Sequence, residues 1–330
     1  MEQTKPIKQI NQHIESVVLI AIVVIYGWAT FQRNFAWKDN LSLWGDSVKK
    51  SPNKYRPHNN FGLALYHNKN YNRAMAEFVE TLRLNPRAEK AYVNIGQIHE
   101  EKGQIEDAIL NYKKALEISP DFTGALHFLG NIYEKQGPLD TALLYYKKAL
   151  RINPENPKLL ISMGSALHKK GLFLQAINYY KMALQIDANL PEAYYNLGLA
   201  YDEKGLLNEA TYYYQQSLKL KPEYPKALSN LGIIYAKTGK IEEAIDLFKK
   251  ALDTEPDDIL ILLNLGFAYE ELAKSYEHRA ESRELRIKAI GIYHKVLSIS
   301  PDNMQARERI TKLLAKKASN GHDSDARPVK

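Results

Sequence analysis

Cysteine is absent from the 330 residues of this chain. Its absence excludes a disulfide framework, a thiolate zinc site, an iron–sulfur cluster and a cysteine nucleophile. It leaves the cellular compartment open, because a chain without thiols is redox-silent anywhere. The phosphate-binding patterns G-x-x-x-x-G-K-[ST] and G-x-G-x-x-G are also missing, as is the zinc motif H-E-x-x-H. The sequence therefore predicts no enzyme, no cofactor, no metal site and no small-molecule substrate.

The net charge is +7 and the isoelectric point is about 9.1, which raises the question of nucleic-acid binding. The excess of positive charge lies in the two ends, residues 1–56 and 301–330. Residues 57–300 carry equal numbers of basic and acidic side chains. Because a nucleic-acid groove needs clustered positive charge, we expect no nucleic acid among the partners.

One apolar run lies near the N-terminus, where residues 16–31 carry no charge. At 1.5 Å per residue the run spans about 24 Å, against roughly 30 Å for the hydrocarbon core of a bilayer. We predict a single-pass transmembrane anchor over residues 16–32, which follows an N-terminal tail over 1–15. A cleaved signal peptide is one alternative, because Gly27, Trp28 and Ala29 form a small-x-small site. A buried soluble helix is another.

The rest of the chain repeats with a period of 34 residues. Glycine recurs at 62, 96, 130, 164, 198, 232 and 266, and proline at 52, 86, 120, 154, 222 and 256. Alanine recurs at 74, 108, 142, 176, 210 and 244, and an aromatic residue at 78, 112, 146, 180, 214 and 248. Four columns with one period predict a solenoid of stacked structural repeats.

Each repeat is predicted to be a pair of antiparallel helices. In the second repeat Tyr92, Ile95 and His99 follow the helical spacing of one face, and Gly103 ends that helix. Ala108 and Tyr112 begin the matching face of a second helix. These columns closely resemble the tetratricopeptide repeat family. The resemblance implies an all-α fold, a right-handed superhelix that binds other proteins in its concave groove.

We divide the chain as follows: a half-repeat junction over 38–54, seven repeats over 55–303 with an 11-residue insertion within 273–288, a capping helix over 304–316 and a disordered tail over 317–330. The insertion is inferred from the seventh repeat, in which the alanine and aromatic columns arrive at Ala289 and Tyr293, 11 residues late. Since 11 residues make about three helical turns, we expect longer helices rather than a loop.

The junction carries a second resemblance, to the transmembrane-and-TPR protein O-mannosyltransferase-like family. The matching residues are Arg33-Asn34, Trp37, Asp39, Leu41-Ser42-Leu43-Trp44 and Asn59-Asn60. In that family the repeats follow the last of many transmembrane helices and face away from the cytoplasm. The resemblance implies an extracytoplasmic solenoid, whereas the lysines and arginines near the apolar run favour a cytoplasmic one. The side of the membrane stays open.

Candidate binding residues come from the asparagine column two residues before the repeat glycine. These residues are Asn60, Asn94, Asn196, Asn230 and Asn264, and Phe128 and Ser162 interrupt the column. The family resemblance implies that this position faces the groove, where an amide can both donate to and accept from a peptide backbone. Arg56, Lys90 and Lys226 lie four residues before three of these asparagines and could bind a carboxylate.

We therefore predict a membrane-anchored, non-catalytic scaffold that binds other proteins through its groove. Its partners would be extended peptide segments or a polytopic membrane protein. The alternative function is an accessory subunit that presents acceptor proteins to a membrane glycosyltransferase system.

Overall fold

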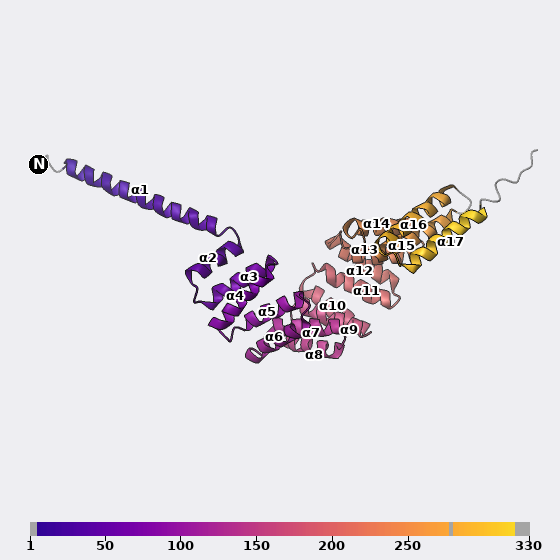
Figure 1. Cartoon of the computed structure of the whole chain (residues 1–330), viewed down its shortest axis with the longest axis horizontal. Coiled ribbons are helices and arrows are strands. Elements are labelled where there is room, and N and C mark those ends of the chain that lie inside the picture. Colours follow the sequence, from indigo (N-terminus) through magenta and orange to yellow (C-terminus); the bar gives the residue numbers. More distant parts are fainter. Residues whose placement is uncertain (1–4, 277–279, 321–330) are drawn as a thin grey trace, which may run out of the picture. The chain divides into compact units, whose positions relative to one another are not determined.

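The computed structural model describes residues 5–276 and 280–320, and every regular element in these ranges is an α-helix. The helices follow one another in the order drawn in Figure 1. They form two compact units, Met1–Ile152 and Asn153–Lys330. The all-helical repeat fold predicted from the four columns is thus confirmed for the described part of the chain.

In the first unit a long helix and a short helix precede three helix pairs. The bounds are α1 Lys5–Ala36, α2 Asn40–Lys50, α3 Tyr55–His67, α4 Tyr71–Leu84, α5 Glu89–Glu101, α6 Ile105–Ile118, α7 Thr123–Gln136 and α8 Leu139–Ile152. Asp39 begins α2 with a capping box: its carboxylate accepts from the Ser42 backbone N–H at 2.8 Å, and Ser42 Oγ accepts from the Asp39 backbone N–H at 3.2 Å.

In the second unit four helix pairs precede a final helix. The bounds are α9 Pro157–Lys169, α10 Phe173–Ile186, α11 Pro191–Glu203, α12 Leu207–Leu220, α13 Pro225–Lys237, α14 Ile241–Thr254, α15 Ile259–Ser275, α16 Ala280–Ile299 and α17 Met304–Asn320. Proline at the first position of α9, α11 and α13 fits the helix start, where its missing N–H would be unpaired in any case.

Each pair closes on a contact between a glycine of its first helix and an aromatic ring of its second. A Cβ at Gly96 would come 2.5 Å from Cε1 of Tyr112, and a Cβ at Gly130 would come 2.4 Å from Cε1 of Tyr146. Both rings are fully buried. Since close-packed interiors leave no room for an overlap of this size, only glycine lets the two helices approach so closely.

The turn inside most pairs uses a glycine in the left-handed conformation. Gly103 has a φ of 72° and Gly137 a φ of 107°, values that other residues adopt only at a cost. In the first pair Lys69 occupies this place with a φ of 57°. The first turn therefore carries backbone strain that the later turns avoid.

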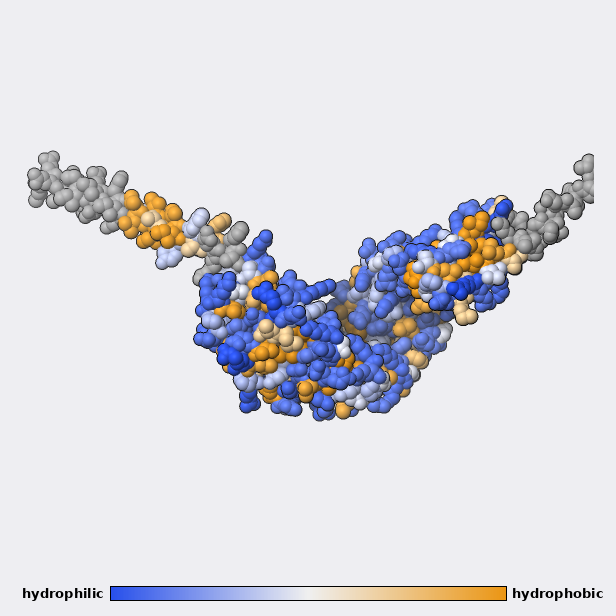
Figure 2. Space-filling model, in the orientation of Figure 1, coloured by the Kyte–Doolittle hydropathy of each residue, from blue (hydrophilic) through white to orange (hydrophobic). Residues whose placement is uncertain are grey.

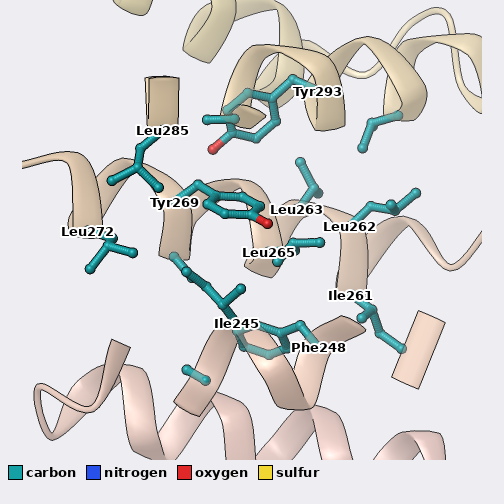
Figure 3. Close-up of a cluster of buried hydrophobic side chains, with 14 of the residues drawn as sticks. Ile245, Phe248, Ile261, Leu262, Leu263, Leu265, Tyr269, Leu272, Leu285 and Tyr293 are labelled. Carbon is teal, nitrogen blue, oxygen red and sulfur yellow. The ribbon is translucent and has the colours of Figure 1, made fainter. Parts of the chain in front are cut away.

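The seventh pair keeps the same contact in spite of its added residues. A Cβ at Gly266 would come 2.5 Å from Cε1 of Tyr293, the residue in which the delayed aromatic column ends. Helix α15 has 17 residues and α16 has 20, against 13 and 14 in the preceding pair. Figure 3 shows Tyr293 above Leu263 and Leu265 of α15, with Phe248 of α14 below them. The added residues lengthen the helices and leave the core contact in register.

The N-terminal helix differs from the prediction. Among the residues whose side chains the structure describes, no helix is both long and apolar enough to cross a membrane. The transmembrane anchor predicted over 16–32 is therefore not supported. The physical reason is length, because the uncharged residues 16–31 span only about 24 Å as a helix.

The ends of the chain also depart from the predicted boundaries. Helix α1 begins at Lys5, inside the predicted tail, and its Pro6 falls in the first turn, where proline is tolerated. Helix α17 continues to Asn320, beyond the predicted cap over 304–316. Residues 1–4 and 321–330, which include most of the predicted C-terminal tail, and residues 277–279 of the insertion lie outside the described residues.

Candidate functional site

A cavity of about 390 Å³ lies between the first two helix pairs of the first unit. Helix α3, the connection between α4 and α5, and the first turn of α5 form its walls. The lining residues are Tyr55, Arg56, Asn59, Asn60, Asn85, Ala88, Glu89 and Lys90. Two cations, one carboxylate and three amides thus face one space, and all of these groups can hold a polar ligand.

Three predicted site residues, Arg56, Asn60 and Lys90, meet in this cavity. A fourth, Asn94, lies beside them, because its Nδ2 donates to Asn59 Oδ1 at 3.3 Å. The sequence reasoning missed Asn59 as a site residue, although it directly precedes the asparagine column. Its amide joins the column residues of two successive repeats, which a search for one position per repeat does not find.

The two cations of the cavity keep their charge and their freedom. The Arg56 Nε–H donates to the Tyr55 hydroxyl at 3.3 Å, and this bond raises the pKa of the guanidinium. Arg56 and Lys90 are both exposed, whereas Asn59 and Asn60 are half-buried. The amides are held by the helix pair, and the cations can move to meet a ligand carboxylate.

The predicted residues of the second unit do not form a comparable cavity in the described part of the chain. Asn196, Asn230 and Asn264 are half-buried on the first helices of successive pairs, and Lys226 is exposed at the start of α13. Asn230 Nδ2 donates to the Tyr214 hydroxyl at 3.2 Å and lies 3.5 Å from the Tyr195 hydroxyl. The amide group of Asn230 therefore contacts its own protein.

Two residues that break the predicted ladder have packing roles or neighbours in the first unit. Phe128 stacks on the core ring of Tyr112, with centroids 5.3 Å apart and planes 12° from parallel. His58 is buried, with Nδ1 2.7 Å from Glu77 Oε2 and Nε2 2.8 Å from the Pro52 carbonyl oxygen. Histidine at this place ties α3 to α4 and to the preceding turn. Within the described residues no group of three potential ligands could hold a metal ion.

Comparison with protein families decides what the repeats are. A TPR repeat profile matches residues 96–137, 130–171 and 173–205. A tetratricopeptide repeat profile matches residues 191–224 and 225–258, in the register of the glycine and proline columns. This chain is a tetratricopeptide repeat protein. The tetratricopeptide scaffold is typically non-catalytic.

Among curated proteins the chain resembles part of the protein O-mannosyl-transferase TMTC3. The human protein is 26% identical over 100 residues, which are 30% of this chain and 11% of that protein. The mouse protein is 25% identical over 92 residues, which are 28% of this chain and 10% of that protein. The matched region thus spans about a tenth of the length of these relatives and represents their tetratricopeptide region.

Several solved structures share the fold. The Cut9–Hcn1 hetero-tetramer of the APC/C aligns with a TM-score of 0.66 at 18% identity, over 83% of this chain and 52% of that chain. Pseudomonas aeruginosa PilF aligns with a TM-score of 0.56 at 22% identity, over 69% of this chain and 98% of that chain. At these identities the likeness shows the tetratricopeptide fold alone.

Proposed function

We propose that this tetratricopeptide protein is a non-catalytic scaffold that binds extended peptide segments of other proteins. The observation that carries the proposal is the cavity of the first unit, where Arg56, Asn60 and Lys90 converge with Asn59. Its lining is polar and offers both donors and acceptors, which suits a peptide backbone. Its two exposed cations suit an acidic side chain or a C-terminal carboxylate.

The groups of the cavity set the expected affinity. A hydrogen bond between neutral groups contributes about 0.5–1.5 kcal/mol, and one to a charged group about 1.5–3 kcal/mol. Two charge-assisted bonds from Arg56 and Lys90 with two amide bonds thus give roughly 4–9 kcal/mol before the cost of association. The cavity by itself corresponds to weak binding, about millimolar to micromolar, so a physiological partner would contact further repeats.

The test is an array of acidic and neutral peptides probed with the whole chain. Arg56→Gln with Lys90→Gln is expected to abolish binding to the acidic peptides, because both ligand-pairing charges are lost. Lys113→Gln is the matched control, since Lys113 is exposed on α6 and does not line the cavity. Equal binding by the double variant and the control would show that the cavity is not the peptide site.

The asparagines of the second unit belong to the same proposal and need a separate test. Asn196 and Asn264 have no side-chain hydrogen bond within the described part of the chain, so their amides can meet a ligand. Replacing Asn196, Asn230 and Asn264 together by alanine is expected to weaken binding of a long peptide partner further. Unchanged capture of such a partner would restrict recognition to the first unit.

We further propose that α1 associates with a lipid bilayer. Its apolar side chains are exposed on all sides, as Figure 2 shows for the orange surface of the helix, and Val18, Ile22 and Ile25 are 52%, 44% and 65% exposed. A groove of a protein partner would cover one face of a helix, whereas lipid covers every face. Exposed apolar surface of this extent is costly in water.

Flotation with phosphatidylcholine vesicles tests the association. Replacing Val18, Ile22 and Ile25 together by asparagine is expected to release the chain from the vesicles. Val79→Asn is the matched control, because Val79 is 54% exposed but stands alone on α4. Release by the control as well, or retention of the triple variant, would contradict a role for α1.

A second candidate function is an accessory subunit that presents acceptor proteins to a membrane glycosyltransferase. It is favoured by the similarity to the tetratricopeptide region of the protein O-mannosyl-transferase TMTC3. Crosslinking in membranes is expected to join the chain to a polytopic membrane protein. Ser51→Cys provides the only thiol, so a membrane-impermeant reagent reports on which side the repeats lie. We expect labelling in intact cells. Purification without any polytopic partner would contradict the accessory role.

A further inference from the structure

A second cavity, of about 270 Å³, lies in the second unit where the last three helices meet. Helix α15 contributes Glu270 and Lys274, α16 contributes Arg286, and α17 contributes Arg309, Lys312 and Leu313. Four basic side chains thus surround one carboxylate and one apolar wall. Such a concentration of positive charge in a hollow is typical of an anion site.

The insertion of the seventh repeat builds this cavity. Lys274 lies near the end of the lengthened α15, and Arg286 lies in the lengthened first half of α16. In the shorter preceding pair, α13 and α14 end before these places. Lengthening the two helices therefore adds two cations beside the final helix, at a place that an ordinary repeat does not have.

One arginine of the cavity is held in place from two sides. Arg309 Nη1 donates to Glu270 Oε2 at 3.4 Å, and the Arg309 guanidinium lies 4.2 Å from the centroid of the Phe267 ring. Glu270 is itself fixed, because its Oε1 accepts from the Tyr293 hydroxyl at 2.5 Å and its side chain is buried. A donor oriented in this way loses little entropy when it binds.

The other cations of the cavity are available to a ligand. Lys274 pairs with Glu271 at 2.6 Å and Lys312 with Glu308 at 3.8 Å, both on exposed helix surfaces, where such pairs contribute little. Arg286 is half-buried and forms no ion pair with any described residue. Glu270 balances one of the two arginines, so one guanidinium charge stays unneutralised in the cavity.

We propose that this cavity binds an acidic side chain of a peptide partner. Arg286 and Arg309 would hold its carboxylate, and Leu313, which is 7% exposed, would contact its methylene groups. One unneutralised guanidinium matches a single carboxylate, and an apolar wall suits an amino-acid side chain better than a free inorganic anion. The site is distinct from the cavity of the first unit and does not depend on it.

Fluorescence anisotropy with a labelled hexa-glutamate peptide tests the site. The whole chain is used with Arg56→Gln and Lys90→Gln already in place, so that the first cavity does not contribute. In this background the peptide is expected to bind, and a hexa-glutamine peptide is not. Adding Arg286→Gln is expected to raise the Kd about 10-fold or more, because a charge-assisted bond is lost. Arg286→Lys is expected to restore part of the affinity.

The matched control is Arg283→Gln, which removes the same charge from the exposed surface of α16 outside the cavity. It is expected to change the Kd by less than about twofold. Equal losses for Arg283→Gln and Arg286→Gln would overturn the proposal, since they would reveal general charge attraction. Displacement of the peptide by an equal concentration of inorganic phosphate would also overturn it, as would absence of peptide binding in this background. Peptide binding by the intact chain alone would then locate recognition in the first cavity.

Discussion

The glycine column offers a sharp test of how each repeat is held together. In Gly130→Ala the new Cβ would lie 2.4 Å from Cε1 and 2.6 Å from Cδ1 of Tyr146. The ring has no space to withdraw, because it is fully buried and its hydroxyl lies 2.7 Å from Asn131 Oδ1 and 2.7 Å from Glu134 Oε2. Either the helices separate or the ring leaves its site and loses its hydrogen-bond partners.

The magnitude follows from three opposing contributions. Overpacking costs about 1–3 kcal/mol. Loss of the two tyrosine hydrogen bonds costs about 0.5–1.5 kcal/mol each, whereas alanine is favoured over glycine within a helix by about 1 kcal/mol. The free energy of unfolding is therefore expected to fall by about 3 kcal/mol. Urea unfolding followed by circular dichroism measures this change as a lower midpoint.

Two variants show whether the cause is steric. Gly291→Ala is the control, because a Cβ there meets no atom within 4 Å on the surface of α16, and it is expected to stabilise the chain by about 0.5–1 kcal/mol. In a Tyr146→Leu background Gly130→Ala is expected to cost less than about 1 kcal/mol, because the ring edge is gone. The reasoning is refuted if Gly130→Ala behaves like Gly291→Ala or if its cost is unchanged by Tyr146→Leu.

Three further predictions concern single residues. Burial lowers the pKa of His168 below its ordinary 6.5, and its Nε2 is buried without a hydrogen-bond partner among the described residues. The neutral ring is the folded form, so the free energy of unfolding should fall as pH drops below 6.5, and His168→Leu should flatten this fall in urea titrations from about pH 8 to about pH 5. A variant with unchanged pH dependence would contradict it. Lys69→Gly relieves a φ of 57° and should raise the melting temperature, with a net gain of up to about 1 kcal/mol; a lower melting temperature would show that the turn is not strained. Glu270→Ala leaves a buried tyrosine hydroxyl and Arg309 without their acceptor, so calorimetry should show a loss of about 1–3 kcal/mol, and wild-type stability would argue against that network.

The repeat fold was predictable because its cause is steric and recurs at a fixed spacing. The glycine at 62 and the ring at 78 are 16 residues apart in the sequence, and each later pair repeats that contact. The same logic extends to Gly266 and Tyr293, where the spacing grows by whole helical turns and the contact survives. Local packing of this kind needs no information from distant parts of the chain.

The N-terminal helix was harder to predict because a short apolar run allows several structures. Hydropathy alone does not separate a membrane span from a helix that is exposed along its length. The helix boundaries also depend on residues with weak signals, since Lys5 starts α1 inside a stretch assigned to a tail. Propensity acts over several residues, so the ends of an element are its least determined part.

The candidate site was predictable in part, and the asparagine column shows why. Asn94 donates to Asn59, and Asn230 lies within 3.5 Å of the Tyr195 hydroxyl; in both cases the partner is 35 residues earlier. The column residue therefore reaches toward the residue that precedes the same column in the previous repeat. Whether its amide is free for a ligand depends on that neighbouring residue, and one repeat considered alone does not contain the information.

The same relation separates the asparagines that can recognise a ligand from those that hold the repeats together. The residue 35 positions before Asn196 is Ile161, a buried aliphatic side chain without an acceptor. Asn196 accordingly keeps its amide, whereas Asn230 spends its amide on tyrosine hydroxyls. A column that looks uniform in sequence thus alternates between binding and structural roles because its neighbours differ. Pairs of positions in successive repeats, rather than single columns, decide where a tetratricopeptide protein can bind a peptide.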